Sequence, residues 1–164
     1  MTKPELKERF LSDVTENQKV ILKVCCIYTS TKDDFNDLFQ EIHLQLWKSY
    51  NTFKGQSKLS TWIYRIALNT ALQRLRKAYL YNPIDLSSNQ YYDLPEIPSV
   101  SISSNLAHLY DLINQLNDLE KAIIILYLDK YSHKEIADIV GISKTNVGTK
   151  ISRIKQKLKS ILKR

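Results

Sequence analysis

Residues 60–76 read STWIYRIALNTALQRLR, and the fold of the chain can be worked out from this stretch. It contains no Gly or Pro, and at 100° per residue its apolar side chains cover most of the circumference, which predicts a helix buried on most sides. Its polar side chains fall on one narrow stripe, formed by Arg65, Asn69, Gln73 and Arg76. Trp62 lies on the same stripe. An indole among cations and amides is an unusual composition for the only polar face of a buried helix.

The composition predicts a small globular protein. The chain has 164 residues, of which 43% are hydrophobic, enough for one ordinary domain or two small ones. No apolar run approaches the roughly 18 residues that suggest a membrane-spanning helix. The N-terminus, MTKPELKERF, has no apolar core of the kind that a signal peptide needs. We therefore expect a cytoplasmic protein with no membrane insertion.

The residues that usually carry chemistry are few and scattered. Cys25 and Cys26 are neighbours in a predicted helix and point about 100° apart, so we expect buried free thiols. His43, His108 and His133 have no ligand spacing with each other or with the cysteines. Three glycines in the whole chain leave no Gly-rich phosphate loop. We expect no metal, no cofactor and no catalytic residue.

Positive charge is concentrated in two blocks. Residues 1–82 carry 13 Lys/Arg and 8 Asp/Glu (+5), residues 83–105 carry three acids and no base (−3), and residues 106–164 carry 11 and 6 (+5). Residues 143–164 hold eight bases and no acid. Two basic blocks separated by an acidic strip favour a polyanionic partner bound at two places. The alternative, an ordinary solvated surface, explains scattered lysines well but one-sided clusters poorly.

The helical pattern is interrupted once. Residues 81–105, YNPIDLSSNQYYDLPEIPSVSISSN, contain three of the four prolines and six serines, so we assign 83–105 to an extended, flexible acidic linker. Helices are predicted at about 4–29, 33–49 and 59–80 before it, and at about 106–116, 118–129, 133–140 and 144–162 after it. Asn117 with Glu120, and Ser132 with Glu135, fit helix-capping pairs, and Gly141 fits a helix end. The expected fold is all-α, with two small helical domains, 1–82 and 106–164.

The last two predicted helices form a helix-turn-helix. In HKEIADIV (133–140), Ile136, Ala137 and Val140 are expected to point inward. After the GIS turn, the helix KTNVGTKISRIKQKL has one apolar stripe, made of Val147, Ile151, Ile154, Leu158 and Ile161. Its opposite face and flanks carry Lys144, Thr145, Asn146, Thr149, Lys150, Ser152, Arg153 and Gln156. Short polar side chains can reach base edges while Lys and Arg hold phosphates, so we expect a DNA-reading helix rather than a protein-binding bundle.

The second predicted helix has an acidic face. In DFNDLFQEIHLQLWKSY the core stripe is predicted to comprise Phe35, Leu38, Phe39, Ile42 and Leu46. Leu44 projects to the opposite side, among Asp37, Gln40, Glu41 and Lys48. One exposed leucine often has no function, but here it is surrounded by acid and amide groups on a basic domain. Periodicity alone leaves a protein contact and an ordinary surface equally open.

Three segments together resemble a known family. DLFQEIHLQLW (37–47), FKGQSKLSTWIYRIALNTALQRLR (53–76) and the late helix-turn-helix are similar to the group IV, or extracytoplasmic-function, sigma factors of bacterial RNA polymerase. The resemblance covers both domains in the family's order and therefore almost the whole chain. It implies a promoter-specificity subunit that binds core RNA polymerase, reads the −35 and −10 promoter elements and helps to melt the −10 region.

The resemblance also implies a role for each site. Asp37, Gln40, Glu41 and Leu44 correspond to the family's docking surface for the clamp coiled coil of the β′ subunit. The loop 53–61, with Phe53, Lys54 and Lys58, corresponds to the loop that captures a flipped −10 base, and Asn69 to the asparagine that lines the base-reading site. The C-terminal domain corresponds to the −35 reader beside the β flap, the linker to the segment in the RNA exit path, and a separate anti-sigma factor is an expected partner.

This implied role explains the composition of the 62–76 stripe. The indole of Trp62 can stack on an unstacked base, Arg65 and Arg76 can neutralise phosphates, and Asn69 can bond a base edge. Trp62 as a simple cap on the core is the structural alternative. The recognition helix departs from the family in two places, because Gly148 stands where relatives often carry Arg or Lys, and Ser143 replaces a usual proline.

Two other classes of protein compete with this reading. An autonomous helix-turn-helix regulator would bind an operator without polymerase, usually as a dimer, and no dimerisation heptad is visible. A nucleic-acid enzyme would need paired carboxylates, a Cys/His constellation or a metal motif, and none is present in the sequence.

Overall fold

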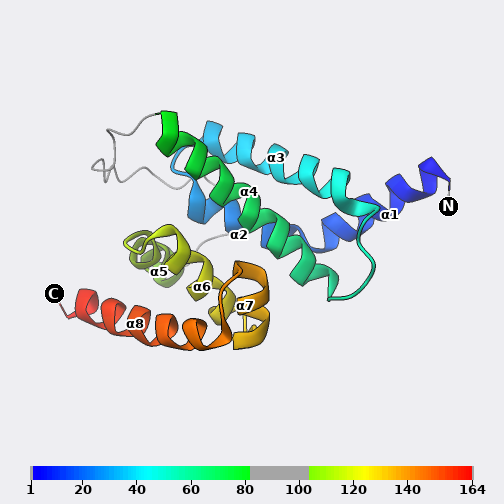
Figure 1. Cartoon of the computed structure of the whole chain (residues 1–164). Coiled ribbons are helices and arrows are strands. Elements are labelled where there is room, and N and C mark those ends of the chain that lie inside the picture. Colours follow the sequence, from blue (N-terminus) through cyan, green and yellow to red (C-terminus); the bar gives the residue numbers. More distant parts are fainter. Residues whose placement is uncertain (1, 82–103, 164) are drawn as a thin grey trace. The chain divides into compact units, whose positions relative to one another are not determined.

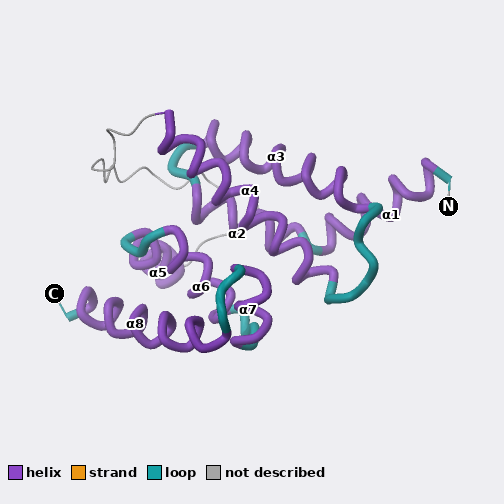
Figure 2. Tube along the Cα trace, in the orientation of Figure 1, coloured by secondary structure: helices purple, strands orange, loops and turns teal. Residues whose placement is uncertain are grey.

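The computed structural model of the protein describes residues 2–81 and 104–163. Within these ranges all regular structure is helical, which confirms the predicted all-α fold (Figure 2). The helices belong to two compact units (Figure 1). The first unit holds α1 (Lys3–Glu16), α2 (Gln18–Tyr28), α3 (Lys32–Tyr50) and α4 (Leu59–Tyr81). The second holds α5 (Ser104–Asn114), α6 (Asp118–Leu128), α7 (His133–Val140) and α8 (Lys144–Leu162).

The first core lies among α2, α3 and α4, which pack against one another pairwise. Its largest fully buried side chains come from all three helices: Ile21, Val24, Leu38, Ile42, Leu46, Ile63, Tyr64 and Leu68. The predicted core stripe of α3 is correct at its centre and wrong at its start. Phe35 and Phe39 are only half-buried and stack on each other at 6.3 Å between ring centroids, because α3 begins at the edge of the core.

The predicted first helix, 4–29, is wrong as a single element. The structure ends α1 at Glu16 and begins α2 at Gln18, with Asn17 between them. The Asn17 side-chain amide donates a hydrogen bond of 2.8 Å to the carbonyl oxygen of Asp13, and its backbone leaves helical geometry at φ −104° and ψ 12°. Asn side chains compete with the backbone for such bonds and so favour helix ends.

The second core lies among α6, α7 and α8, and its local signals match the sequence. The Asn117/Glu120 and Ser132/Glu135 capping boxes are both formed, and Gly141 ends α7 at φ +80°. That conformation is costly for residues with a Cβ atom.

Two expectations for the second unit need correction, the inward face of α7 and the start of α5. Ile139 is buried and Val140 only half-buried, although Val140 was expected to point inward, because α7 turns its central face toward α6 and α8. The predicted apolar stripe of α8 is buried at Val147, Ile151 and Ile154 and half-buried at Leu158 and Ile161. Helix α5 starts at residue 104, inside the predicted linker, of which residues 83–103 lie outside the described ranges.

Candidate nucleic-acid interface

The polar stripe of α4 is exposed in the structure along most of its length. Asn69, Gln73 and Arg76 are exposed, whereas Trp62 and Arg65 are half-buried. The other sides of the helix are packed, with Ile63, Tyr64, Ala67, Leu68 and Ala71 in the core. The stripe is therefore a polar ridge on a helix that the core holds in place.

Arg65 differs from the other residues of this stripe because it has an unsatisfied buried donor within the described part of the chain. Its Nε atom is buried and has no hydrogen-bond partner among the described residues. An unsatisfied buried donor costs about 1–3 kcal/mol. The guanidinium is thus held close to the core surface at a local cost in stability.

The loop before α4 is attached to the stripe through aromatic rings. Phe53 lies against Trp62 with ring centroids 5.0 Å apart, and Tyr50 approaches Trp62 at 6.3 Å. Gly55 turns the loop at φ +69°, a region that glycine enters without strain. Lys54 and Lys58 are exposed on the same loop. The loop thus presents two cations beside a partly covered indole.

Tyr50, just before this loop, anchors the start of the loop to α1. Its hydroxyl donates a 2.5 Å hydrogen bond to a carboxylate oxygen of Asp13 on α1. Burial, together with this hydrogen bond and the charge of Asp13, raises the pKa of Tyr50 to about 12. The phenol therefore stays protonated at neutral pH and joins α1 to the end of α3.

The turn between α7 and α8 is determined by local capping. Ser143, at the position where the resemblance leads one to expect a proline, accepts a hydrogen bond of 3.2 Å from the backbone N–H of Asn146 and is the N-cap of α8. The serine therefore satisfies a helix-terminal donor, and its side chain stabilises the start of the recognition helix.

The outer face of α8 is open for most of the predicted contact residues. Exposed are Lys144, Thr145, Asn146, Thr149, Ser152, Arg153 and Gln156, and Lys150 is half-buried. The Thr149 hydroxyl donates to the carbonyl oxygen of Thr145 at 3.2 Å, so this hydroxyl is left as an acceptor toward any ligand. The structure brings the predicted −35 residues together on one solvent-facing surface.

Two basic residues of α8 have internal roles that the charge pattern did not reveal. Lys155 donates to the Tyr127 hydroxyl at 2.7 Å and lies 4.4 Å from the ring centroid. This hydrogen bond and the ammonium charge lower the pKa of Tyr127. Lys157 pairs with Glu120 at 3.1 Å. Both lysines attach α8 to α6, so not every base in this acid-free segment is available to a polyanion.

The acidic face of α3 is also exposed. Leu44 exposes 49% of its surface, Asp37 and Gln40 are exposed, and Glu41 is half-buried. Together with Gln45 and Arg74, these four residues line a shallow groove. Arg74, from α4, was missed in the sequence because it lies off the polar stripe, and no pattern within α4 shows that it faces α3.

Two general findings concern membrane and metal sites in the described part of the chain. No helix of residues 2–81 or 104–163 combines the length and apolar character that a bilayer crossing requires. In the same ranges no cluster of three or more His, Cys, Asp or Glu side chains is arranged to hold a metal ion.

Comparison with known proteins relates these surfaces to one family. Residues 14–80 match the family model for sigma-70 region 2, and residues 106–158 match that for sigma-70 region 4. The chain is 29% identical to an ECF RNA polymerase sigma-E factor of Haemophilus influenzae over 94% of this chain and 87% of that protein. It is 30% identical to the RNA polymerase sigma factor YlaC of Bacillus subtilis over 75% of this chain and 74% of the relative.

A solved structure shares the fold. The sigma factor RpoE of Bartonella quintana, crystallised with the anti-sigma factor NepR, superposes with a TM-score of 0.76 at 21% identity, covering 95% of this chain and 98% of that one. The chain therefore belongs to the sigma-70 family, in its extracytoplasmic-function group of RNA polymerase sigma factors. It directs RNA polymerase to promoters and serves in transcription initiation.

Proposed function

We propose that the acidic face of α3 is the surface that binds core RNA polymerase, at the clamp coiled coil of its β′ subunit. The observation that carries this proposal is the half-exposed Leu44, which lines the groove together with Asp37, Gln40 and Glu41. An apolar anchor surrounded by polar groups is a common arrangement at the centre of protein interfaces. The N-terminal domain, proposed to span residues 1–82, carries this docking surface.

In the same unit, the loop around Phe53 and the α4 stripe are proposed to bind the −10 element and stabilise its melted strands. The exposed cations Lys54, Lys58 and Arg76 suit phosphates, and the exposed amides Asn69 and Gln73 suit base edges. Trp62 and Phe53 offer aromatic faces for unstacked bases, and Arg65, on the same stripe as Trp62, suits a phosphate. This division of roles follows the chemistry of single-stranded DNA.

The C-terminal domain, proposed to span residues 106–164, is proposed to read the −35 element through α8 and to contact the β flap. Support comes from the exposed polar face of α8, which has no acid from Lys144 to Leu162. Residues 83–105 are proposed to be a linker. The chain is proposed to act in the cytoplasm without catalytic chemistry of its own, under the control of a separate anti-sigma factor like the one bound to its structural relative.

Run-off transcription with purified core RNA polymerase on a promoter library tests the overall function. Specific transcripts should appear only when the chain is added, and their start sites should share −35 and −10 motifs. Absence of specific initiation with several core enzymes, despite specific DNA binding by the chain alone, would favour an autonomous regulator.

The docking surface is tested by Leu44→Asp and Glu41→Lys in a binding assay with core polymerase. Both side chains lie at the surface, so circular dichroism should barely change while binding weakens. Leu11→Asp is a matched control, because Leu11 is 52% exposed on α1 and lies outside the groove. Wild-type binding by both α3 variants would show that the docking surface lies elsewhere.

A further inference from the structure

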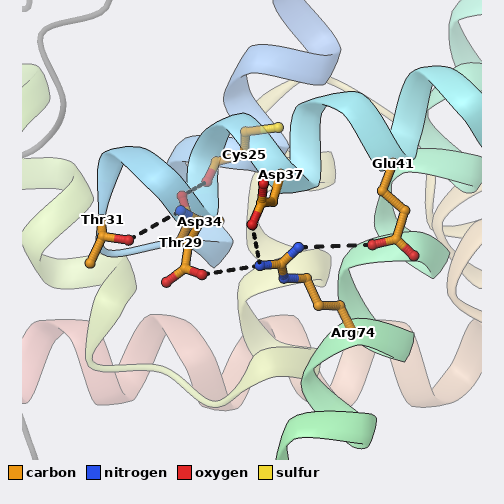
Figure 3. Close-up of polar contacts among 7 residues, drawn as sticks. All are labelled: Cys25, Thr29, Thr31, Asp34, Asp37, Glu41 and Arg74. Atoms are coloured by element: carbon orange, nitrogen blue, oxygen red, sulfur yellow. Dashed lines mark hydrogen bonds and ion pairs between the residues drawn. The ribbon is translucent and has the colours of Figure 1, made fainter.

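Arg74 reaches from α4 to a row of three carboxylates on α3 (Figure 3). The nitrogen-to-oxygen distances are 3.0 Å to Asp34, 3.8 Å to Asp37 and 3.9 Å to Glu41. The three acids occupy positions i, i+3 and i+7 of α3 and therefore share one face of the helix. Two of them belong to the proposed docking surface and one does not.

The three contacts are not equivalent. Only Asp34 accepts a hydrogen bond from the guanidinium, whereas the distances to Asp37 and Glu41 are too long for one. Asp34 is itself placed at the start of α3, where its backbone N–H donates to the Thr31 hydroxyl at 3.1 Å. Arg74 is thus anchored on Asp34, and its charge lies next to Asp37 and Glu41 without occupying their hydrogen-bonding oxygens.

The free energy that these ion pairs contribute should depend on how far they are exposed to water. In the free protein the Arg74 side chain is 31% exposed and that of Asp37 is 67% exposed, and exposed ion pairs contribute little to folding. When a partner covers this face, the carboxylates lose water and need counter-ions. Three carboxylates and one guanidinium carry a net charge of −2. The partner therefore has to neutralise two negative charges rather than three.

We propose that Arg74 is a positioning residue for polymerase docking: it supplies the internal countercharge that lets Asp37 and Glu41 be buried against a basic surface of the partner. The inference rests on the proposed docking function of α3. It requires Arg74 to contribute more to the complex than to the stability of the free chain. A competing effect has the opposite sign, because Arg74 also repels a basic partner.

The test is the affinity and dissociation rate of full-length Arg74→Gln with core RNA polymerase. We expect at least tenfold weaker binding, mainly through faster dissociation, with little change in melting temperature. Lys77→Gln is the matched control, since it removes one exposed positive charge from the same helix. Arg74→Lys should restore part of the affinity, because it keeps the charge and loses the planar fork.

A second pair of variants tests the anchor. Asp34→Asn should reproduce part of the loss although Asp34 lies outside the docking groove. The control is Asp33→Asn, an exposed carboxylate in the same first turn that forms no ion pair with Arg74. Equal binding by both variants would contradict the role of Asp34 as the anchor.

Double-mutant cycles separate positioning from general destabilisation. Arg74→Gln should cost much less affinity in a Glu41→Gln background than in the wild type, and the same amount in a Leu44→Ala background. Unchanged or tighter binding by Arg74→Gln, or a loss that only follows the folded fraction, would overturn the proposal. If Leu44→Asp weakens binding and Arg74→Gln does not, only the inference about Arg74 is wrong; if neither does, the docking assignment is wrong as well.

Discussion

The phenyl ring of Phe53 lies 5.0 Å from the indole of Trp62, centroid to centroid, at an interplanar angle of 40°. Phe53 belongs to the loop before α4 and Trp62 to the first turn of α4, so this pair joins the proposed base-capturing loop to the proposed base-stacking residue. The indole is therefore partly covered in the free protein. A base that stacks on Trp62 has to share this face with Phe53 or displace it.

This arrangement predicts different defects for two stripe variants. Trp62→Ala and Asn69→Ala should both bind core polymerase normally and form fewer open complexes on duplex promoters. A stacking contact is worth about 1–3 kcal/mol per base, which corresponds to a loss of roughly fivefold or more. Permanganate footprinting of the −10 region measures the effect, and wild-type reactivity in both variants would contradict it.

A template with a pre-melted −10 bubble distinguishes the two roles. It should rescue Trp62→Ala more than Asn69→Ala, because base reading is still needed after melting while help with unstacking is not. Equal rescue of both variants would mean that Asn69 does not read a base.

The recognition helix should divide its contacts between bases and phosphates. Arg153 is exposed and is the residue of this face that can bind a guanine bidentately, a contact worth about 1–3 kcal/mol of discrimination. Arg153→Ala should therefore relax the preference at one −35 position. Lys144→Ala should weaken all sequences alike and reduce the salt dependence of binding. Selection from a randomised −35 library measures both, and an unchanged preference in Arg153→Ala would identify it as a phosphate contact.

Gly148→Ala should stabilise the second unit. A Cβ atom at this position would lie 3.6 Å from Nδ1 of His133, an ordinary contact, and Ala is favoured over Gly inside a helix by about 1 kcal/mol. The free energy of unfolding in urea should rise by up to about that amount.

The same variant tests why glycine is present. Because the missing Cβ would point toward His133 on α7, we expect −35 binding to be unchanged. Loss of binding by a stable Gly148→Ala protein would instead indicate that the backbone of α8 approaches DNA closely at this residue.

The two thiols should be unreactive in the folded protein. Cys25 and Cys26 are buried and free, and burial raises their pKa values from 9.0 to about 12 and about 11, respectively. At about pH 8 a thiol reagent should modify them only as fast as the chain unfolds, and in denaturant within the mixing time. Fast labelling of the native protein would show that this part of the core opens locally.

The raised thiol pKa values also set a direction for alkaline stability. The folded state holds these protons more tightly than the unfolded state, so the stabilisation is complete below about pH 9. It is lost as the pH rises from there toward 11 and 12. A Cys26→Ala variant should show a smaller decrease in unfolding free energy over this range.

Features encoded within a few neighbouring residues could be predicted from the amino-acid sequence. The Asn117/Glu120 and Ser132/Glu135 capping boxes and the left-handed Gly141 were all predictable, because their hydrogen bonds or dihedral angles depend on residues at most four positions apart. Helical periodicity was enough to place Leu44 and Arg153 on exposed faces. The family resemblance came from the motifs at 37–47 and 53–76 together with the late helix-turn-helix, and not from periodicity.

Which helix faces meet depends on the packing of the whole unit. Arg74 lies 40 positions from Asp34, and no pattern within either helix shows that α4 carries a guanidinium to the acidic row of α3. The hydrogen bond from Lys155 to the Tyr127 hydroxyl likewise depends on how α8 packs against α6. Such contacts are set by the packing of the cores between the helices. Periodicity gives the direction of a side chain from its own helix, and only the packed neighbour determines whether that side chain meets water, a carboxylate or a ring.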